Sequence, residues 1–329
     1  MSAGSDAPSV DAGFLERALE LAERGRATTH PNPVVGAVVV SGGRVVGEGF
    51  HERKGGEHAE AIALEVAGTR ARGATVYVTL EPCTHHGSTP PCAEALIRAG
   101  VARVVVGQRD PNPEVSGGGV EELRAAGVEV EVADGEPGYR ARLQLEAWRT
   151  WVTLGRPFVT YKVAVTLDGR VRVPGSRWVT GEEARRLVHR LRAASDAVAV
   201  GMGTVREDDP RLDARDVPTP RGQPRRLAFG RGPLRAGSEL ELRPGTLDGE
   251  LAALAAEGVQ SLLLEGGPTL AAAFLERELV DKLLVLVAPR LSGDAPGMVA
   301  ALPHAIELGR LASRRVGEDV LLEAYVHEP

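Results

Sequence analysis

Cysteine and aromatic residues are scarce in this chain. Its 329 residues include two cysteines, Cys83 and Cys92, which gives little support to a disulfide framework. Aromatic residues make up 4% of the chain, and the formal net charge is −6. Proteins that bind nucleic acids usually present a basic surface with stacking aromatic side chains. The composition therefore predicts no nucleic-acid partner.

Long apolar segments are missing as well. The longest runs, at 34–40 and 283–288, are far shorter than the ~20 residues that a membrane-spanning helix needs. The first ten residues, MSAGSDAPSV, have neither the basic start nor the apolar centre of a signal peptide. We therefore expect a cytoplasmic protein without a membrane partner.

Length predicts two domains, 1–150 and 151–329, because a single core rarely grows beyond ~250 residues. In the first domain, apolar periodicity predicts a hairpin through Ser41-Gly42-Gly43 and then alternating helices and strands. The expected helices cover 11–25, 56–68, 91–99 and 119–126, and the expected strands cover 74–80, 102–107 and 128–132. This alternation is typical of an α/β domain with helices packed over a sheet.

An amphipathic helix is expected at 136–154, as a connector between the domains. In the second domain, strands are expected at 157–166, 197–201, 226–229, 259–265, 282–288 and 320–326, and helices at 181–194 and 269–276. The segment 202–215 is predicted as a loop. The segment 218–249 is rich in proline, glycine and arginine and shows only weak periodicity. The second domain is therefore also predicted to be α/β.

The stretch from 56 to 92 carries the clearest chemistry. His58 lies two residues before Glu60, and Cys83 follows a proline and precedes Cys92. A His-x-Glu followed by Pro-Cys and a second cysteine is typical of zinc deaminases, in which the glutamate is not a metal ligand. Three ligands leave the fourth zinc position open for a water molecule, whose pKa the metal lowers to ~7. Glu60 would carry a proton to a ring nitrogen and then to the departing ammonia.

Two other interpretations of this stretch are weighed against the deaminase. The cysteines could be inert while His58 caps a helix, or the zinc could be structural, with His85 or His86 as a fourth ligand. Neither accounts for Glu60, and the residue order and the proline before Cys83 favour the deaminase. One feature departs from that pattern: eight residues separate the cysteines, where nucleoside deaminases usually have two.

The long segment between the cysteines belongs to a wider likeness. TTHPNPVVGAVVV, GEHAEAIAL, VTLEPCTHHGSTPPC and RDPNPEVSGGG resemble the bifunctional deaminase/reductase family of riboflavin biosynthesis. The likeness continues, in the family's order, through YKVAVTLDGRV, SRWVTGEEAR, GMGTVREDDPRL and LLLEGGPTLAAAFL. The resemblance implies a three-layer, cytidine-deaminase-like N-terminal domain and a dihydrofolate-reductase-like C-terminal α/β domain.

The resemblance also implies a reaction. Such an enzyme deaminates 2,5-diamino-6-ribosylamino-4(3H)-pyrimidinone 5′-phosphate and then reduces the ribosyl group to ribityl with NADPH. It implies Zn²⁺ and NADPH as cofactors, a small pyrimidine ribosyl phosphate as substrate, and a homo-oligomer. The positions that match zinc ligands are His58, Cys83 and Cys92, and the position that matches the proton carrier is Glu60.

Four positions match residues that bind the pyrimidine and the ribose phosphate: Asn32, His51, His86 and Asn112. Asn32 lies between two prolines, and a stiff loop suits a side-chain amide that recognises the edge of a base. Turn formation is the alternative explanation of Asn32 and Asn112.

In the reductase domain, the resemblance implies NADPH contacts at Ala164, Trp178, Thr204, Asp208, Gly266, Gly267, Pro268, Thr269 and Leu270. It implies substrate contacts at Ser176, Arg192, Leu212, Arg215 and Glu265. A Gly-Gly turn from a strand into a helix suits a phosphate because its free N–H groups and the helix dipole favour an anion. A plain tight turn would use the same residues.

Arg192 and Arg215 would suit a ribose phosphate, although the arginine-rich composition alone favours solvated surface residues. Lys162 and Asp208 are candidates for assisting protonation in this half.

Two positions depart from the family. Ser88 stands where a basic residue is usual, with Arg53 or Lys54 as conceivable substitutes for binding the phosphate. Arg231 replaces a small hydroxyl residue near the cofactor, where it could clash or pair with the 2′-phosphate. The alternative function is a zinc nucleobase or tRNA deaminase whose C-terminal domain binds a partner and lacks reductase activity. We expect both halves to be active.

Overall fold

The computed structural model describes residues 10–84, 90–112 and 118–329. His85, His86 and Ser88 lie outside these ranges. The chain divides into two compact units, Met1–Thr153 with Pro329, and Leu154–Glu328. This division falls three residues beyond the predicted boundary at 150. Each unit has its own sheet and its own hydrophobic core.

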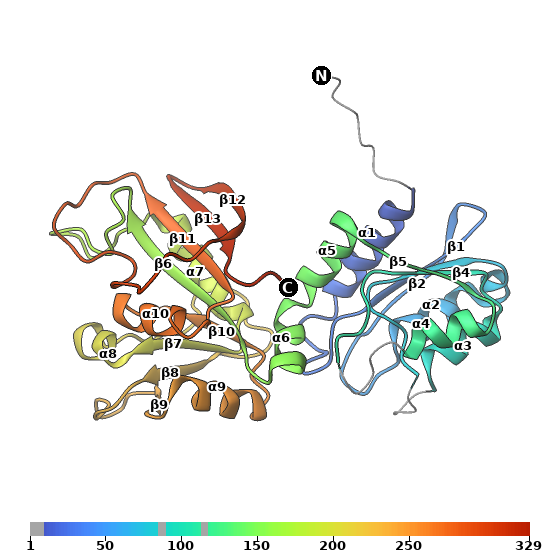
Figure 1. Ribbon diagram of the computed structural model, residues 1–329, viewed down its shortest axis with the longest axis horizontal. Helices are drawn as coiled ribbons and strands as arrows, with labels where there is room; N and C mark the ends of the chain where they lie inside the picture. Colours follow the sequence, from blue (N-terminus) through green and yellow to red (C-terminus); the bar gives the residue numbers. More distant parts are fainter. Residues whose placement is uncertain (1–9, 85–89, 113–117) are drawn as a thin grey trace, which may run out of the picture. The chain divides into compact units, whose positions relative to one another are not determined.

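The first unit begins with a helix and a β-hairpin, after which helices and strands alternate (Figure 1). Its helices are α1 (Val10–Glu23), α2 (Ala59–Ala67), α3 (Cys92–Ala99), α4 (Gly118–Ala125), α5 (Gly135–Gln144) and α6 (Glu146–Leu154), with a 3-10 turn η1 (Gly68–Ala71). Its strands are β1 (Gly36–Ser41), β2 (Arg44–Phe50), β3 (Thr75–Val78), β4 (Arg103–Val106) and β5 (Glu129–Val132).

The sheet of this unit has the strand order β2-β1-β3-β4-β5. β1 runs antiparallel to β2 and β3, while β3, β4 and β5 are parallel. Helices α2, α3 and α4 cover one face, where their alanines and leucines pack against valines of β1, β3 and β4. Because successive strand residues point to opposite faces, Val38 and Tyr77 pack instead against α1 on the other face. The result is the predicted three-layer arrangement (Figure 1).

Two glycines of β2 allow α2 to lie unusually close to the sheet. A Cβ atom on Gly49 would lie 2.4 Å from the carbonyl oxygen of Ala59, and one on Gly47 would lie 2.2 Å from that of Ala63. No other residue fits at such a distance. This packing fixes the N-terminal end of α2, where His58 and Glu60 are found.

The second unit is built on an eight-stranded sheet. Its strands are β6 (Phe158–Thr166), β7 (Ala197–Gly201), β8 (Arg225–Phe229), β9 (Glu241–Arg243), β10 (Ser261–Leu264), β11 (Lys282–Ala288), β12 (Gly309–Val316) and β13 (Asp319–Tyr325). Its helices are α7 (Glu182–Ala194), α8 (Met202–Asp208), α9 (Leu247–Ala256) and α10 (Pro268–Leu275).

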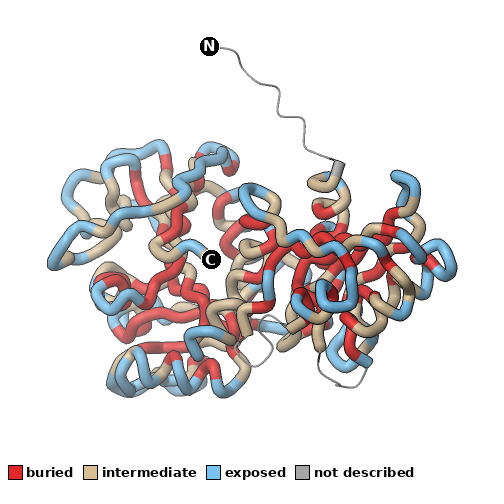
Figure 2. The backbone as a smooth tube through the Cα atoms, turned by 45° about the vertical axis from the view of Figure 1, so that its right-hand side comes forward, coloured by how far each residue is buried: buried red, intermediate tan, exposed pale blue. Residues whose placement is uncertain are grey.

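The strand order of this sheet is β12-β13-β11-β6-β10-β7-β8-β9. The strands from β11 to β9 are parallel, and β13 pairs antiparallel with β11 and β12. In Figure 2 the central strands are buried along most of their length, because helices cover both faces. The carboxyl ends of β6, β7, β8 and β10 therefore share one edge, which is the usual place for ligands in such sheets.

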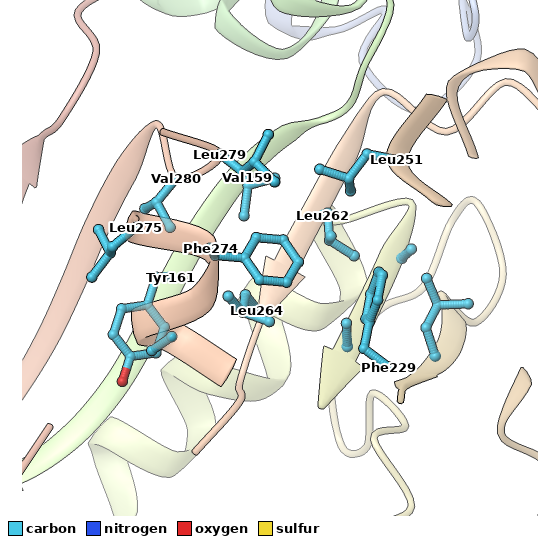
Figure 3. Packing of buried hydrophobic residues seen from close by; sticks show 14 of the residues in the cluster. Val159, Tyr161, Phe229, Leu251, Leu262, Leu264, Phe274, Leu275, Leu279 and Val280 are labelled. Carbon is cyan, nitrogen blue, oxygen red and sulfur yellow. The ribbon is translucent and has the colours of Figure 1, made fainter. Parts of the chain in front are cut away.

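Helices α9 and α10 pack against one face of this sheet, and α7 packs against the other. Phe274 of α10 lies in the core between the sheet of the second unit and helices α9 and α10, among leucines and valines of β6 and β10 (Figure 3). Its ring meets that of Phe229 edge-on, with centroids 5.5 Å apart. Edge-to-face pairs of this kind stabilise a core beyond the area that they bury.

Three predicted segments are wrong in detail, and one strand was missed. The single helix expected at 136–154 is two helices, because Leu145 leaves the helical region with φ −111° and ψ 15°. Both helices belong to the first unit rather than connecting the two. The loop expected at 202–215 begins with α8. The weakly patterned segment 218–249 also holds β9 and the start of α9, and β12 was not expected.

None of the helices in the described ranges combines the length and the apolarity needed to cross a membrane.

Candidate functional site

Three predicted zinc ligands come together in the first unit. His58 is the N-cap residue of α2, in extended conformation, and therefore precedes the first turn in which it was expected. Cys83 follows β3, and Cys92 is the first residue of α3. One possible ligand atom from each residue lies within 4.8 Å of the other two. An imidazole nitrogen with two thiolates is a donor set that zinc prefers, and three ligands leave one position open.

The two thiols differ in their surroundings. The Nδ1 atom of His58 lies 3.2 Å from Sγ of Cys92 and 3.5 Å from Sγ of Cys83. The backbone N–H of Cys92, at the start of α3, also points at Sγ of Cys83 over 3.5 Å. Hydrogen bonds from Cys92 and then from His58 lower the pKa of Cys83 below that of a free thiol. The hydrogen bond to Cys83 and burial raise the pKa of Cys92. Zinc would replace the shared proton and hold both as thiolates.

Glu60 lies in the first turn of α2 and is 3% exposed. Burial raises the pKa of its carboxyl group to about 7, although the nearby His58 opposes this shift. A carboxyl group with a pKa near neutrality can both hold and release a proton. Glu60 is also the glutamate of the His-x-Glu pattern, which in zinc deaminases does not coordinate the metal.

Asn32 and His51 lie beside this cluster. The His51 ring packs edge-on against the His58 ring, with centroids 5.6 Å apart. Its Nδ1 atom lies 2.9 Å from the carbonyl oxygen of Glu57, and its Nε2 atom lies 3.4 Å from Nδ2 of Asn32. Burial lowers the pKa of His51, so its neutral form donates to Glu57 and accepts from Asn32. The structure thus brings both residues to the metal cluster, as a binding role requires.

Asn112 follows β4, and its N–H donates to Oδ1 of Asp110 over 2.8 Å. The predicted residue His86 and the departure at Ser88 lie outside the described ranges. The alternative zinc ligands His85 and His86 are outside them too.

One buried carboxylate near the cluster was not predicted. Glu81, two residues before Cys83, is 4% exposed and accepts hydrogen bonds from the backbone of Asp110 and Val120. An acidic residue directly between an apolar strand and a Pro-Cys pair was the signal in the sequence that could have identified it.

In the second unit, three partly buried charged residues form a cluster on the face covered by α7. Glu265 accepts from Nε and Nη2 of Arg192 over 2.6 and 3.0 Å, and from Nζ of Lys162 over 3.2 Å. Burial alone would raise the pKa of Glu265, but the charge of Lys162 and the hydrogen bonds from Arg192 hold it at about 2. Arg192 also donates to the carbonyl oxygen of Asp213. Ala164 lies on the same face of β6 as Lys162, two residues further on.

The Gly-Gly turn lies at the carboxyl edge of the sheet, between β10 and α10. Leu270 packs against Gly266 and against Gly201 at the end of the neighbouring strand β7. A Cβ atom on Gly267 would lie 3.6 Å from Oγ1 of Thr204, in α8. Gly267 is the N-cap of α10, and Pro268 occupies its first turn. Thr204, Gly266, Gly267, Pro268, Thr269 and Leu270 are therefore neighbours at this edge.

Trp178 and Ser176 form an exposed turn. Trp178 is 49% exposed, and the guanidinium groups of Arg177 and Arg185 lie 4.9 and 5.2 Å from its ring centroid. The Ser176 hydroxyl donates to the carbonyl oxygen of Trp178 over 2.8 Å. This cationic and aromatic surface is compatible with a phosphorylated or aromatic ligand.

The remaining predicted residues have different settings. Leu212 is 2% exposed within a hydrophobic cluster, so only its backbone could meet a ligand. Arg215 is exposed, and its N–H donates to Nδ1 of His189. Asp208 ends α8 in an exposed position. Arg231 follows β8 and donates through Nε to the carbonyl oxygen of Pro244 over 3.4 Å.

Comparisons with known proteins cover both units. Residues 8–108 match the cytidine and deoxycytidylate deaminase zinc-binding region. Residues 157–322 match the RibD C-terminal domain. The riboflavin biosynthesis protein RibD of Aquifex aeolicus is 39% identical, over 95% of this chain and 98% of that protein. RibD of Escherichia coli is also 39% identical, with the same coverage.

This chain belongs to the RibD family. It is a bifunctional deaminase and reductase of riboflavin biosynthesis, with a cytidine-deaminase-like domain followed by a dihydrofolate-reductase-like domain. The solved structure of Acinetobacter baumannii RibD is similar, with a TM-score of 0.84 and 36% identity over 96% of this chain and 98% of that chain.

A deaminase/reductase from Thermotoga maritima has a TM-score of 0.82 and 34% identity, over 96% of this chain and 98% of its own. The match of the C-terminal unit to a reductase domain excludes the alternative of a deaminase with a mere binding domain.

Proposed function

We propose that this enzyme carries out the two steps named for the Thermotoga maritima relative. That protein is a diaminohydroxyphosphoribosylaminopyrimidine deaminase and 5-amino-6-(5-phosphoribosylamino)uracil reductase. The observation that carries the proposal is the convergence of His58, Cys83 and Cys92 beside the buried Glu60. A homo-oligomer is proposed on the family likeness alone.

In the first step, His58, Cys83 and Cys92 would hold zinc, and Glu60 would move protons. Bound zinc supplies a water-derived nucleophile at neutral pH by acting as a Lewis acid. The Glu60 carboxylate would take one proton from the attacking water and deliver it to a ring nitrogen, and would then take the second water-derived proton and deliver it to the leaving amino group. Its pKa near 7 supports this role, because both protonation states are accessible at neutral pH.

Substrate binding in this step is assigned to Asn32, His51, His86 and Asn112. The contact of Asn32 with His51 supports part of this assignment, since it fixes the direction of the Asn32 amide. The amide retains its oxygen as an acceptor for an amino group of the pyrimidine.

In the second step, NADPH would lie at the carboxyl edge of the sheet. Its phosphates would meet Gly266 to Leu270 and Thr204, with further contacts at Ala164, Trp178 and Asp208. The bare backbone of Gly267 at the start of α10 supports this placement, because it allows close approach of an anion to free N–H groups. Hydride transfer is the chemistry of the nicotinamide, and the protein orients the two reactants.

The reductase substrate would meet Ser176, Arg192, Leu212, Arg215 and Glu265. Arg192 already forms a two-bond pair with Glu265, so we assign it to orienting that carboxylate. Arg215 is exposed, and its Nε atom lies 3.7 Å from Oδ1 of Asp213, which makes it the better candidate for the ribose phosphate. The Lys162 ammonium group remains the candidate proton donor. Its bond to Glu265 would hold it in place.

The deaminase step is tested with zinc-loaded protein and the diaminopyrimidine ribosyl phosphate. Glu60→Gln should lower the rate of ammonia release at least ~100-fold, the usual loss for a general acid–base group, while zinc content stays at one per chain. Glu65→Gln, an exposed position of the same helix, is the matched control and should match wild type. Ammonia release that survives Glu60→Gln would contradict the assigned role.

A further inference from the structure

The segment between β4 and α4 is attached to the zinc-binding segment by one side chain. Oε2 of Glu81 accepts from the N–H of Asp110 over 3.0 Å, and Oε1 accepts from the N–H of Val120 over 3.0 Å. Asp110 lies shortly after β4 and Val120 lies in the first turn of α4. The carboxylate therefore joins the two described ends of this segment.

Glu81 has no ionic partner within the described ranges. A buried carboxylate is costly unless it is paired or fully hydrogen-bonded, and Glu81 is 4% exposed. The Val120 N–H lies in the first turn of α4, where a helix offers no partner of its own, and Glu81 supplies one. A negative charge at the start of α4 also suits the helix dipole. The arrangement is therefore a specific contact rather than an incidental one.

Backbone packing reinforces the same attachment. A Cβ atom on Gly119 would lie 1.9 Å from the carbonyl oxygen of Pro82, and one on Gly118 would lie 2.9 Å from Oγ1 of Thr84. The start of α4 thus lies directly on the Pro82–Thr84 stretch that contains Cys83. Only glycine permits this approach.

Asn112 is reached from Glu81 through two hydrogen bonds. Glu81 holds the Asp110 N–H, and the Asp110 carboxylate accepts from the Asn112 N–H over 2.8 Å. An Asx turn of this kind fixes the backbone two residues further on. Displacement of Asp110 would therefore move Asn112 relative to the metal ligands.

We propose that Glu81 is a positioning residue, which sets Asn112 against the zinc site and so determines how tightly the deaminase substrate binds. The inference rests on the proposed function, because Asn112 is assigned there to the substrate. An interaction that serves binding alone changes KM and leaves kcat nearly unchanged.

The test compares wild type with Glu81→Gln, full length and zinc-loaded. The amide offers one acceptor where two N–H groups need one each, and its NH₂ group faces the other donor. We expect KM for the diaminopyrimidine ribosyl phosphate to rise at least ~10-fold, the factor of one hydrogen bond to a charged group. We also expect kcat to stay within about threefold of wild type and the zinc content to be unchanged. Hydrogen exchange at the Asp110 and Val120 amides should be faster than in wild type.

Two further variants separate this role from a general effect on folding. Gly119→Ala should raise KM in the same way without changing any charge, because its new Cβ atom meets the Pro82 carbonyl oxygen. Glu122→Gln, in the same helix, should change neither KM nor kcat. Reductase activity with the aminouracil substrate should stay at the wild-type level in all three variants.

Wild-type ammonia release is measured first, and its absence would overturn the proposed function together with this inference. Wild-type activity with an unchanged KM in Glu81→Gln would overturn the inference alone. Loss of zinc or of kcat in that variant would also overturn it, since Glu81 would then serve the metal site or the fold rather than Asn112.

Discussion

The pKa values of two glutamates in this protein, Glu60 and Glu265, are shifted in opposite directions. Among the described residues, no cationic side chain is hydrogen-bonded to Glu60, and burial raises its pKa to about 7. The Glu265 side chain is 9% exposed, but Lys162 and Arg192 outweigh the effect of burial and hold its pKa at about 2. The first is therefore suited to proton transfer, and the second is suited to remain a fixed negative charge.

Glu265→Gln tests the fixed charge. The variant leaves Lys162 and Arg192 without their carboxylate in a buried setting, which should lower the free energy of unfolding of the second unit by about 3 kcal/mol at pH 7. A carboxyl group whose pKa is depressed in the folded state stabilises the protein at pH values above its unfolded-state pKa of about 4.3. The difference in the free energy of unfolding between wild type and Glu265→Gln should therefore shrink as the pH falls from about 4.3 toward 2.

Urea unfolding at several pH values measures this difference, with Glu276→Gln at the exposed end of α10 as the control. A difference that is independent of pH would show that the ion cluster is not its source.

At the residue scale, the sequence allowed the zinc ligands to be predicted but not Glu81. His58, Cys83 and Cys92 belong to a pattern of side chains, which is visible as spacing. Glu81 binds backbone N–H groups that lie 29 and 39 positions further along the chain. The acidic residue between an apolar strand and a Pro-Cys pair could have been noticed in the sequence, but backbone partners leave no residue type to recognise, so the contact itself needed the structure.

At the scale of elements, the close packing of α2 on β2 links a strand to the metal site. Gly49 faces the carbonyl oxygen of Ala59, the residue that follows His58. Movement of α2 away from the sheet would carry His58 and Glu60 with it, while Cys83 and Cys92 are held by other elements.

Gly49→Ala should therefore lower both stability and zinc affinity. Its Cβ atom would lie 2.4 Å from backbone, which cannot yield as a flexible side chain could. Overpacking of this kind costs about 1–3 kcal/mol. Thermal unfolding and competition with a zinc chelator measure the two effects, and Gly13→Ala, which meets nothing within 4 Å, is the control. Zinc affinity equal to that of wild type would contradict the coupling between β2 and the site.

Elements with a clear apolar period were predicted with their correct type, whereas α8, β9, α9 and β12 were missed. β6, α7 and β11 show clear apolar periods over seven residues or more. α8 has seven residues and runs into Asp208, Asp209 and Pro210, which favour a loop. The break at Leu145 has neither glycine nor proline, so nothing in the sequence separates α5 from α6.

At the scale of the whole molecule, the two units have separate hydrophobic cores, and each unit has its own functional site. The first unit brings together three side chains that could hold a metal ion, and the second presents a parallel sheet edge with a glycine turn. The order of the two domains along the chain matches the proposed order of the reactions. The central claim is that the deaminated product of the first site is the substrate of the second.

The most direct measurement follows ammonia release and NADPH oxidation together, on zinc-loaded protein given the diaminopyrimidine ribosyl phosphate. Ammonia should precede NADPH loss, and Glu60→Gln should abolish both. Adding the aminouracil product to Glu60→Gln should restore NADPH oxidation. NADPH oxidation by Glu60→Gln with the diamino compound alone would contradict the proposed order, and ammonia without NADPH oxidation in wild type would contradict the cofactor assigned to the second site.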